Sequence, residues 1–153
     1  DDPLRGVQRG PGIACAEQAV RETAARGIPV CGHFILGLPG ETRETLLEDV
    51  SRINALPLDS VKFHQLQLLK GTPMAGEFAA RPEDFVRWTL DGYIDLLVDI
   101  LERLRPGIAV GRLAASVPPR FLAVPGWGVK AAEFSRLLDA RMVGRDTWQG
   151  RKA

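Results

Sequence analysis

The sequence predicts an α/β fold in which parallel strands alternate with helices. Two observations carry this prediction. Helical and strand-forming stretches alternate along the chain, which is the order of parallel βα units, and the composition, 45% hydrophobic and 25% charged, is typical of a globular protein. The strand-forming runs are too few to close a barrel, which ordinarily needs about eight strands, so we expect them to form an arc of one.

The first half of the chain is expected to hold two helices and a buried strand between them. An alanine-rich helix over 14–26 ends at a glycine, a residue that commonly terminates helices. The apolar run 30–36 is a short buried strand, closed by turn residues 37–40. A second helix runs from about Thr42 to just before Pro57. Its apolar stripe consists of Leu46, Leu47, Val50 and Ile53.

The second half of the chain adds two strands and two helices. Residues 60–69 alternate enough to form a strand, which leads into a turn over 70–73. A long helix is expected over 82–106, because proline suits a first helical turn and the carboxylates beside it favour the positive helix start. Residues 108–113 form a third strand, and the last helix covers about 130–142.

Charge and composition argue against several classes of function. Lys and Arg number 20 against 19 Asp and Glu, a net charge of +1 that does not imply nucleic acid as a partner. No apolar run approaches the roughly 18 residues needed to span a membrane, and the start does not resemble a signal peptide. Cys15 and Cys31 lie in apolar stretches, and we expect them to be small buried side chains in a reducing cytoplasm. The chain starts at Asp1, so an upstream segment is expected.

Strand periodicity places both histidines on one side of the predicted sheet. Alternation groups His33, Ile35 and Gly37 on one strand, and Lys62, His64 and Leu66 on the next. Both groups are expected to line a barrel lumen, while the outer helices contact Val30, Phe34, Leu36, Val61 and Phe63. A strand histidine is more often a hydrogen-bonded core residue than a catalyst, but Lys62 and His64 would be costly to bury without partners. A polar patch in the lumen is therefore predicted.

The loop over 37–42 opens a helix and allows two interpretations. Glycines at a helix N-terminus can present free backbone N–H groups to a ligand. Alternatively, Pro39 and Gly40 supply the backbone angles of a tight turn and Thr42 caps the helix. On these residues alone, the sequence favours the tight turn.

Two segments of the sequence carry a resemblance to a known family. They read Gly27-Ile-Pro-Val-Cys-Gly-His33-Phe-Ile-Leu-Gly37-Leu-Pro39-Gly-Glu41-Thr42 and Val61-Lys-Phe-His64-Gln-Leu-Gln-Leu-Leu-Lys70-Gly-Thr72-Pro73. Matching segments elsewhere are Arg9-Gly10, Arg112-Leu113, Ala123-Val-Pro125-Gly-Trp127 with Lys130, and Thr147-Trp-Gln149-Gly150. In this order the segments resemble radical S-adenosylmethionine (SAM) proteins of the YhcC family, whose radical core is similar to the elongator-type branch. The resemblance covers nearly the whole chain.

The resemblance implies a partial TIM barrel of which this chain holds a C-terminal portion. Residues 1–107 would be the later βα units of the barrel, and residues 108–153 the C-terminal α/β extension of the family. The whole protein would bind SAM and a 4Fe–4S cluster and generate a 5′-deoxyadenosyl radical that abstracts hydrogen from an unknown substrate. The family's cluster is held by a cysteine triad, and the sequence has only two cysteines, which lie 16 positions apart. We therefore expect this chain alone to be inactive and to need the missing N-terminal half of the barrel.

The resemblance also suggests which side chains bind ligands. Ile35, Gly37, Leu66 and Gln67 would bind the adenine side of SAM, although Leu66 and Gln67 could equally be plain barrel packing. Lys62, His64 and Arg112 would face the substrate, and no metal ligand is assigned. Arg112 on an apolar strand needs an acceptor if it is buried: a substrate carboxylate or phosphate, or an internal carboxylate.

The sequence departs from the family pattern at a few positions. Pro11 replaces a usual histidine, residues 114–116 are less polar than in the family, and Gln65 and Gln67 stand where histidine is frequent. An amide does not titrate near neutral pH, so these two strand positions have lost a capacity for proton transfer.

Two alternatives to the radical enzyme remain open. The first is a cluster-free α/β module that binds a cofactor or nucleotide, because the loop over 37–42 is intact where the cysteine triad is absent. The second is a structural remnant that pairs with another chain through its first strand, because an incomplete barrel leaves backbone groups unpaired at its edge.

Overall fold

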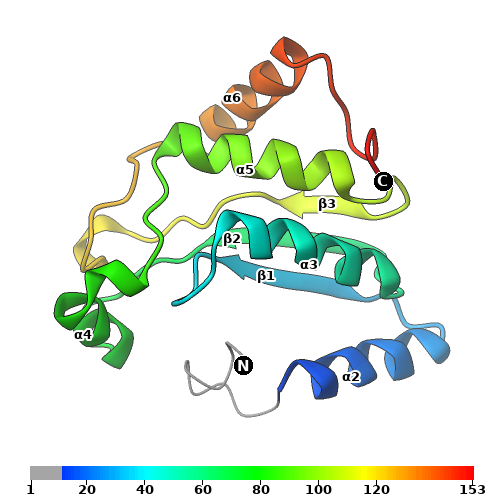
Figure 1. Cartoon of the computed structure of the whole chain (residues 1–153), viewed down its shortest axis with the longest axis horizontal. Coiled ribbons are helices and arrows are strands. Elements are labelled where there is room, and N and C mark those ends of the chain that lie inside the picture. The colour runs from blue at the N-terminus through cyan, green and yellow to red at the C-terminus, as the bar shows by residue number, and fades with distance from the viewer. Residues whose placement is uncertain (1–11) are drawn as a thin grey trace.

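A three-stranded sheet lies at the centre of the computed structural model, which describes residues 12–153 (Figure 1). The strand order is β1-β2-β3 and both pairs are parallel, as the sequence predicts. The elements are α2 (Ile13–Ala25), β1 (Cys31–Leu36), α3 (Arg43–Ala55), β2 (Ser60–Gln65), α4 (Pro73–Ala80), η1 (Pro82–Asp84), α5 (Leu90–Arg103), β3 (Ala109–Arg112), η2 (Pro119–Phe121) and α6 (Ala131–Gly144). Arg9, Gly10 and Pro11, which enter the family resemblance, lie outside the described residues.

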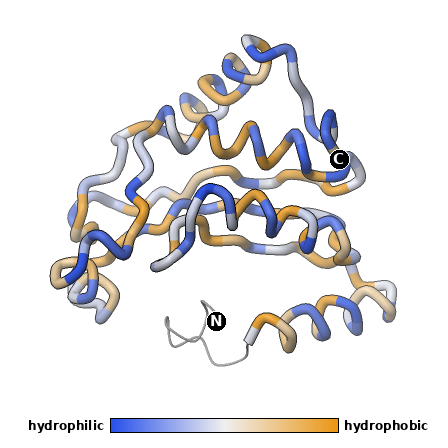
Figure 2. Tube along the Cα trace, viewed as in Figure 1, coloured by the Kyte–Doolittle hydropathy of each residue, from blue (hydrophilic) through white to orange (hydrophobic). Residues whose placement is uncertain are grey.

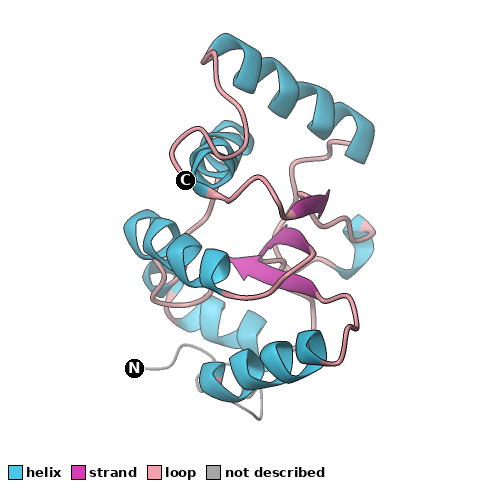
Figure 3. Ribbon diagram, turned by 90° about the vertical axis from the view of Figure 1, so that its right-hand side faces the viewer, coloured by secondary structure: helices cyan, strands magenta, loops and turns pink. Residues whose placement is uncertain are grey.

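The core lies between one face of the sheet and the helices α3 and α5. Val61 and Phe63 of β2 are fully buried, and they share a hydrophobic cluster with Val50 of α3 and Leu97 of α5. Strands and helices form adjoining layers (Figure 3), and apolar residues recur along the strands and along α5 (Figure 2). Each fully buried side chain of this size stabilises the fold by about 1.5–3 kcal/mol. The core therefore fixes which face of each strand is left for ligands.

The predicted division of the strands into two faces is confirmed. Leu36, Val61 and Phe63 belong to the buried cluster, and Val30 and Phe34 pack against it. His33 and Ile35 alternate with these residues and are exposed on the other face of β1. We call the face that carries His33, Lys62, His64 and Arg112 the inner face of the sheet.

Three helices begin at threonine caps that the sequence places just before them. Thr42 forms a capping box with Thr45 at the start of α3, which confirms the capping role predicted for Thr42. Thr72 caps α4, whose first residue is a proline, and Thr89 caps α5 by accepting the N–H of Gly92 at 3.0 Å.

The prediction of one long helix over 82–106 is wrong. Residues 82–84 form only a 3-10 turn, the backbone at Phe85 is extended, and α5 begins at Leu90. Phe85 is buried, and the backbone carbonyl of Trp88 accepts the indole N–H of Trp127 at 3.0 Å. These tertiary contacts override the local helix preference of the segment. The short helix α4 also forms within the stretch over which the sequence predicts no helix.

Strand β2 is shorter than predicted, and β1 is less buried. β2 ends at Gln65, and Leu69 instead forms an isolated antiparallel bridge with Leu122. β1 lies at the edge of the described sheet, and no residue of α2 is buried. Cys15 and Cys31 are both exposed and free, so the prediction that they are buried side chains is wrong.

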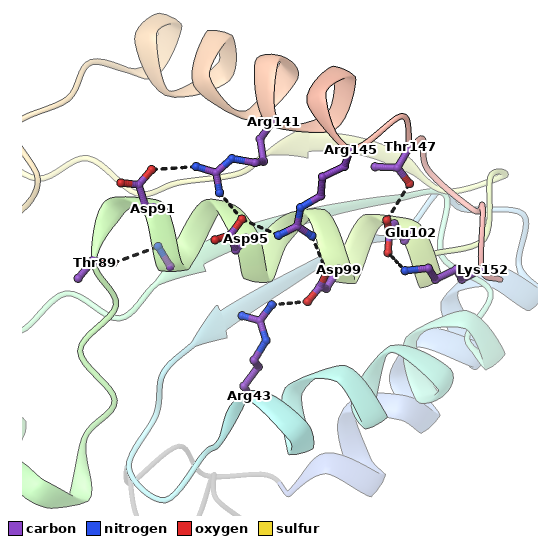
Figure 4. A network of polar contacts seen from close by, with 11 residues as sticks. Arg43, Thr89, Asp91, Asp95, Asp99, Glu102, Arg141, Arg145, Thr147 and Lys152 are labelled. Carbon is purple, nitrogen blue, oxygen red and sulfur yellow. Dashed lines mark hydrogen bonds and ion pairs between the residues drawn. The ribbon is translucent and has the colours of Figure 1, made fainter.

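An ionic network fastens α6 and the C-terminal residues to α5 (Figure 4). Asp91, Asp95 and Asp99 repeat every four residues along α5 and so share one face. The paired side chains are Arg141 with Asp91 and Asp95, Arg145 with Asp95 and Asp99, Arg43 with Asp99, and Lys152 with Glu102. Burial opposes ionisation of Asp95, but hydrogen bonds and charges from Arg141 and Arg145 hold its pKa below the ordinary value. This network orients the C-terminal segment against the core.

Candidate functional site

The loop after β1 is held by a single carboxylate oxygen. Glu41 Oε2 accepts the backbone N–H groups of Gly37 and Leu38, each at 2.8 Å. Gly37 has a φ of 98°, a conformation that favours glycine. Burial raises the pKa of Glu41 above its ordinary value, although the two backbone hydrogen bonds act to lower it. Glu41 thus sets the shape of the loop, a role that the sequence pattern did not reveal.

The backbone donors of this loop are satisfied from within the protein. The N–H of Gly40 donates to the carbonyl of Asp84, and that of Glu41 donates to the carbonyl of Leu38, each at 3.0 Å. With the N–H groups of Gly37 and Leu38 also engaged, the loop is the capped tight turn, not a set of free N–H groups. The carbonyl of Gly37 accepts no hydrogen bond within residues 12–153.

A cavity of about 590 Å³ opens beside the C-terminal end of β2. It is lined by residues 65–68, 85–90, 122 and 124–127. Leu66 and Gln67, two of the predicted cofactor residues, are among these. Gly37 is next to the cavity wall, because a Cβ atom at this position would lie 3.0 Å from the indole nitrogen of Trp88. Ile35 lies outside the cavity, 42% exposed on β1.

Two buried polar atoms of the cavity wall have no hydrogen-bond partner among the described residues. They are Gln67 Oε1, an acceptor, and Trp88 Nε1, a donor. Gln67 is held from its other side, where Nε2 donates to the carbonyl of Ala115 at 3.3 Å. Buried polar atoms without partners are rare and often mark a site where a ligand binds. An aromatic and apolar wall with one acceptor and one donor suits a flat heteroaromatic ring.

The inner face of the sheet collects basic side chains from all three strands. Ile35 is paired with His64, His33 with Lys62, and Lys62 with Arg112. The rings of His33 and His64 are stacked, with their centroids 6.1 Å apart. Burial lowers the pKa of His64, and the nearby charges of Arg112, His33 and Lys62 lower it further. The structure thus brings the predicted substrate-side residues Lys62, His64 and Arg112 together.

The described residues provide no obvious metal centre. Within residues 12–153, no three His, Cys, Asp or Glu side chains lie close enough to share a metal ion. In the same range, no helix is both long enough and apolar enough to cross a membrane.

Sequence reasoning also missed Trp88. The indole of Trp88 lines the cavity. Trp88 falls within residues 82–106, for which the sequence predicts a helix, and an aromatic residue on a helix suggests only packing. Its separation from α5 by the cap residue Thr89 is the one signal in the sequence that could have set it apart.

Comparisons with known proteins place this geometry in context. The family model described as the Radical_SAM C-terminal domain matches residues 58–143. The uncharacterized protein YtqA of Bacillus subtilis is 30% identical over 145 residues, covering 95% of this chain and 44% of that protein. YhcC of Escherichia coli K12 is 29% identical over 127 residues, covering 83% of this chain and 40% of that protein.

A solved structure shares the fold. Elp3 of the archaeon Methanocaldococcus infernus, with an N-terminal deletion, matches with a TM-score of 0.78 at 19% identity, over 96% of this chain and 34% of that one. The chain spans less than half the length of the curated relatives described above.

Proposed function

Because this chain belongs to the radical SAM proteins of the YhcC family and matches their C-terminal portion, we propose that it forms the part of the enzyme that binds the adenine of SAM. The likeness in fold to Elp3 and the parallel sheet agree with the predicted fold class. The family assignment rests on the Radical_SAM C-terminal domain family, whose family model matches residues 58–143. The division into barrel residues 1–107 and an extension over 108–153 stays a prediction; β3 pairs with β2 across that boundary.

One observation carries the proposal. Leu66 and Gln67, the positions to which the resemblance assigns contact with adenine, line a cavity whose wall contains two unpartnered buried polar atoms. Adenine offers what these atoms lack, since its amino group donates a hydrogen bond and its ring nitrogens accept one. Gln67 Oε1 would accept from the amino group, and Trp88 Nε1 would donate to a ring nitrogen. Leu66 would cover one face of the ring.

The other two predicted cofactor residues have supporting parts in this proposal. The carbonyl of Gly37, which accepts no hydrogen bond from a described residue, offers a second acceptor, and Glu41 holds that residue in place. Ile35 offers an apolar surface on the inner face, beside His64 of the neighbouring strand.

When bound to a reduced 4Fe–4S cluster, SAM supplies a 5′-deoxyadenosyl radical that abstracts hydrogen from a substrate. The cysteines of this chain do not fit such a cluster, because Cys15 lies on α2, Cys31 lies on β1, and the sequence has no third. We therefore assign cluster binding to the whole protein, outside the residues described above.

The test is to measure the binding of SAM and of S-adenosylhomocysteine to the 153-residue chain, with tryptophan fluorescence as the readout. Gln67→Ala removes the acceptor and is expected to weaken binding of both about fivefold, the effect of one ordinary hydrogen bond. Gln18→Ala is the matched control, because Gln18 is exposed on α2 and its side chain bonds only to Glu22. Equal affinities for Gln67→Ala and the unmodified chain would contradict the assignment of the cavity.

A second candidate function is a cofactor- or nucleotide-binding module without radical chemistry. The observation in its favour is that the loop over 37–42 is held in shape by Glu41, although the sequence has only two cysteines. Such a module would bind adenosine as tightly as SAM, whereas a radical SAM protein must also recognise the methionyl group. Comparing the two affinities in a form of the protein that carries the cysteine triad separates the candidates.

A further inference from the structure

We propose that the inner face of the sheet binds an oxyanion, a carboxylate or phosphate group of the substrate, between Lys62, His64 and Arg112, with His33 at the edge of the site. This inference rests on the proposed function, because it assigns a substrate class to the same half-barrel. Its residues, Lys62, His64 and Arg112, are not among those that line the adenine cavity, so failure of one site can be distinguished from failure of the other.

The register of the three strands places the basic side chains close together. The strand register sets Lys62 of β2 between His33 of β1 and Arg112 of β3, while His64 lies two residues further along β2 on the same face. Gly111 has no side chain, and a Cβ atom there would lie 3.5 Å from carbons of Lys62, so the lysine chain runs close over β3. Three neighbouring strands thus direct their nitrogen-bearing side chains to one region.

The basic side chains of the inner face have no acidic counterpart on the described strands. The three strands contain no Asp or Glu, and the sheet residues that alternate toward the core are apolar or glycine apart from Gln65. None of His33, Lys62, His64 and Arg112 forms an ion pair or a side-chain hydrogen bond with a described residue. By contrast, the arginines packed on α5 each have a carboxylate partner. Among the described residues, the positive charges of the inner face therefore have no carboxylate partner.

His64 lies in surroundings that disfavour its charged form. Its Nε2 is buried and has no hydrogen-bond partner among residues 12–153. Burial and the three neighbouring basic groups disfavour its protonated form, which lowers its pKa. A bound oxyanion would reverse both effects, since it accepts hydrogen bonds and adds negative charge. Arginine and lysine together are the usual means of holding such a group.

The experiment exploits the fact that the sequence has only two histidines, both on this face. The ring protons of His33 and His64 are followed by NMR during pH titrations of the 153-residue chain, and His33→Gln assigns the signals. Titrations are run in sodium chloride, in phosphate and in acetate at one ionic strength, because salt screening alone would relax the repulsion. Phosphate and acetate represent the two sources of the anion.

The expected result is a saturable shift of the His64 signal with phosphate, acetate or both, together with a rise in the pKa of His64 toward about 6.5 relative to chloride. Arg112→Gln and Lys62→Gln should each weaken anion binding about threefold. Arg136→Gln, which removes an exposed arginine on α6, is the matched control and should leave the affinity unchanged.

Three outcomes would overturn the proposal. The first is that neither anion shifts the His64 signal beyond the effect of chloride. The second is that Arg136→Gln weakens binding as much as Arg112→Gln, which would mean unspecific attraction. The third is a His64 pKa already at its ordinary value in chloride, with no response to added anion. SAM binding at the adenine cavity is measured separately, so its failure would leave these results interpretable.

Discussion

The loop after β1 should depend on the oxygen of Glu41 and not on its charge. Both hydrogen bonds, from Gly37 and Leu38, end on the same oxygen, Oε2, each at 2.8 Å. Glutamine at this position can present one carbonyl oxygen in the same place, and burial already disfavours the charged form of Glu41. Alanine removes the acceptor and leaves two N–H groups, on two buried residues, without a partner.

The magnitude follows from these two bonds. A buried donor left unsatisfied costs about 1–3 kcal/mol. Two such donors together would cost about 2–6 kcal/mol. Because Glu41 is only partly buried and water can reach one side, we expect Glu41→Ala to lower the free energy of unfolding by the lower half of this range, about 2–4 kcal/mol. Glu41→Gln should change it by less than about 1 kcal/mol.

Urea unfolding, monitored by tryptophan fluorescence, measures both changes. Glu44→Gln controls for the loss of a carboxylate, because Glu44 is exposed and lies in the first turn of α3. If Glu41→Gln destabilises the chain as much as Glu41→Ala, the carboxylate charge holds the loop and the reasoning from a single acceptor oxygen is refuted.

Three further predictions concern the loop after β1, the inner face of the sheet and the cap of α5. Gly37→Ala should lower the free energy of unfolding by about 2 kcal/mol or more, because its Cβ would lie 3.0 Å from Trp88 Nε1 at a φ of 98°. Gly40→Ala, at a φ of 80° with open space around it, should lower it by only about 1 kcal/mol. Near-ultraviolet circular dichroism and urea unfolding would report both changes, and equal losses of stability would contradict the close contact at Gly37. Because the folded-state pKa of His64 is lowered, its protonation opposes folding, so its contribution to stability is complete above about pH 7 and is lost as pH falls through the ordinary pKa near 6.5. Between about pH 8 and pH 5, the free energy of unfolding should therefore fall less steeply with decreasing pH for His64→Gln than for the unmodified chain. The same pH dependence for both proteins would count against the lowered pKa of His64. Thr89→Ala should lower the free energy of unfolding by about 1 kcal/mol through loss of the α5 cap, and no measurable change in urea unfolding would show that the cap is dispensable.

Local sequence patterns were sufficient for the strands, most helices and the division of the sheet into faces. Alternation in 30–36 and 60–65 separates apolar from polar side chains by the geometry of a strand itself, so the placement of His33 and His64 did not need the rest of the fold. Thr42 and the glycines after β1 likewise act within a few residues of their own position. The cofactor and substrate roles of the predicted residues were not tested by the structure and stay predictions.

Contacts between distant segments decided the rest. Whether residues 82–88 continue a helix depends on where Phe85 and the carbonyl of Trp88 find partners, and the partner of the latter, Trp127, lies 39 residues away. The cavity exists only because those two segments meet beside the end of β2, and the unpartnered Gln67 and Trp88 atoms become visible only there. The sequence by itself determined the parallel α/β architecture and the polar inner face, because both follow from periodicity. The tertiary structure alone decided where the cavity lies and which polar atoms remain free, because hydrogen bonding across the fold is not encoded in any local pattern.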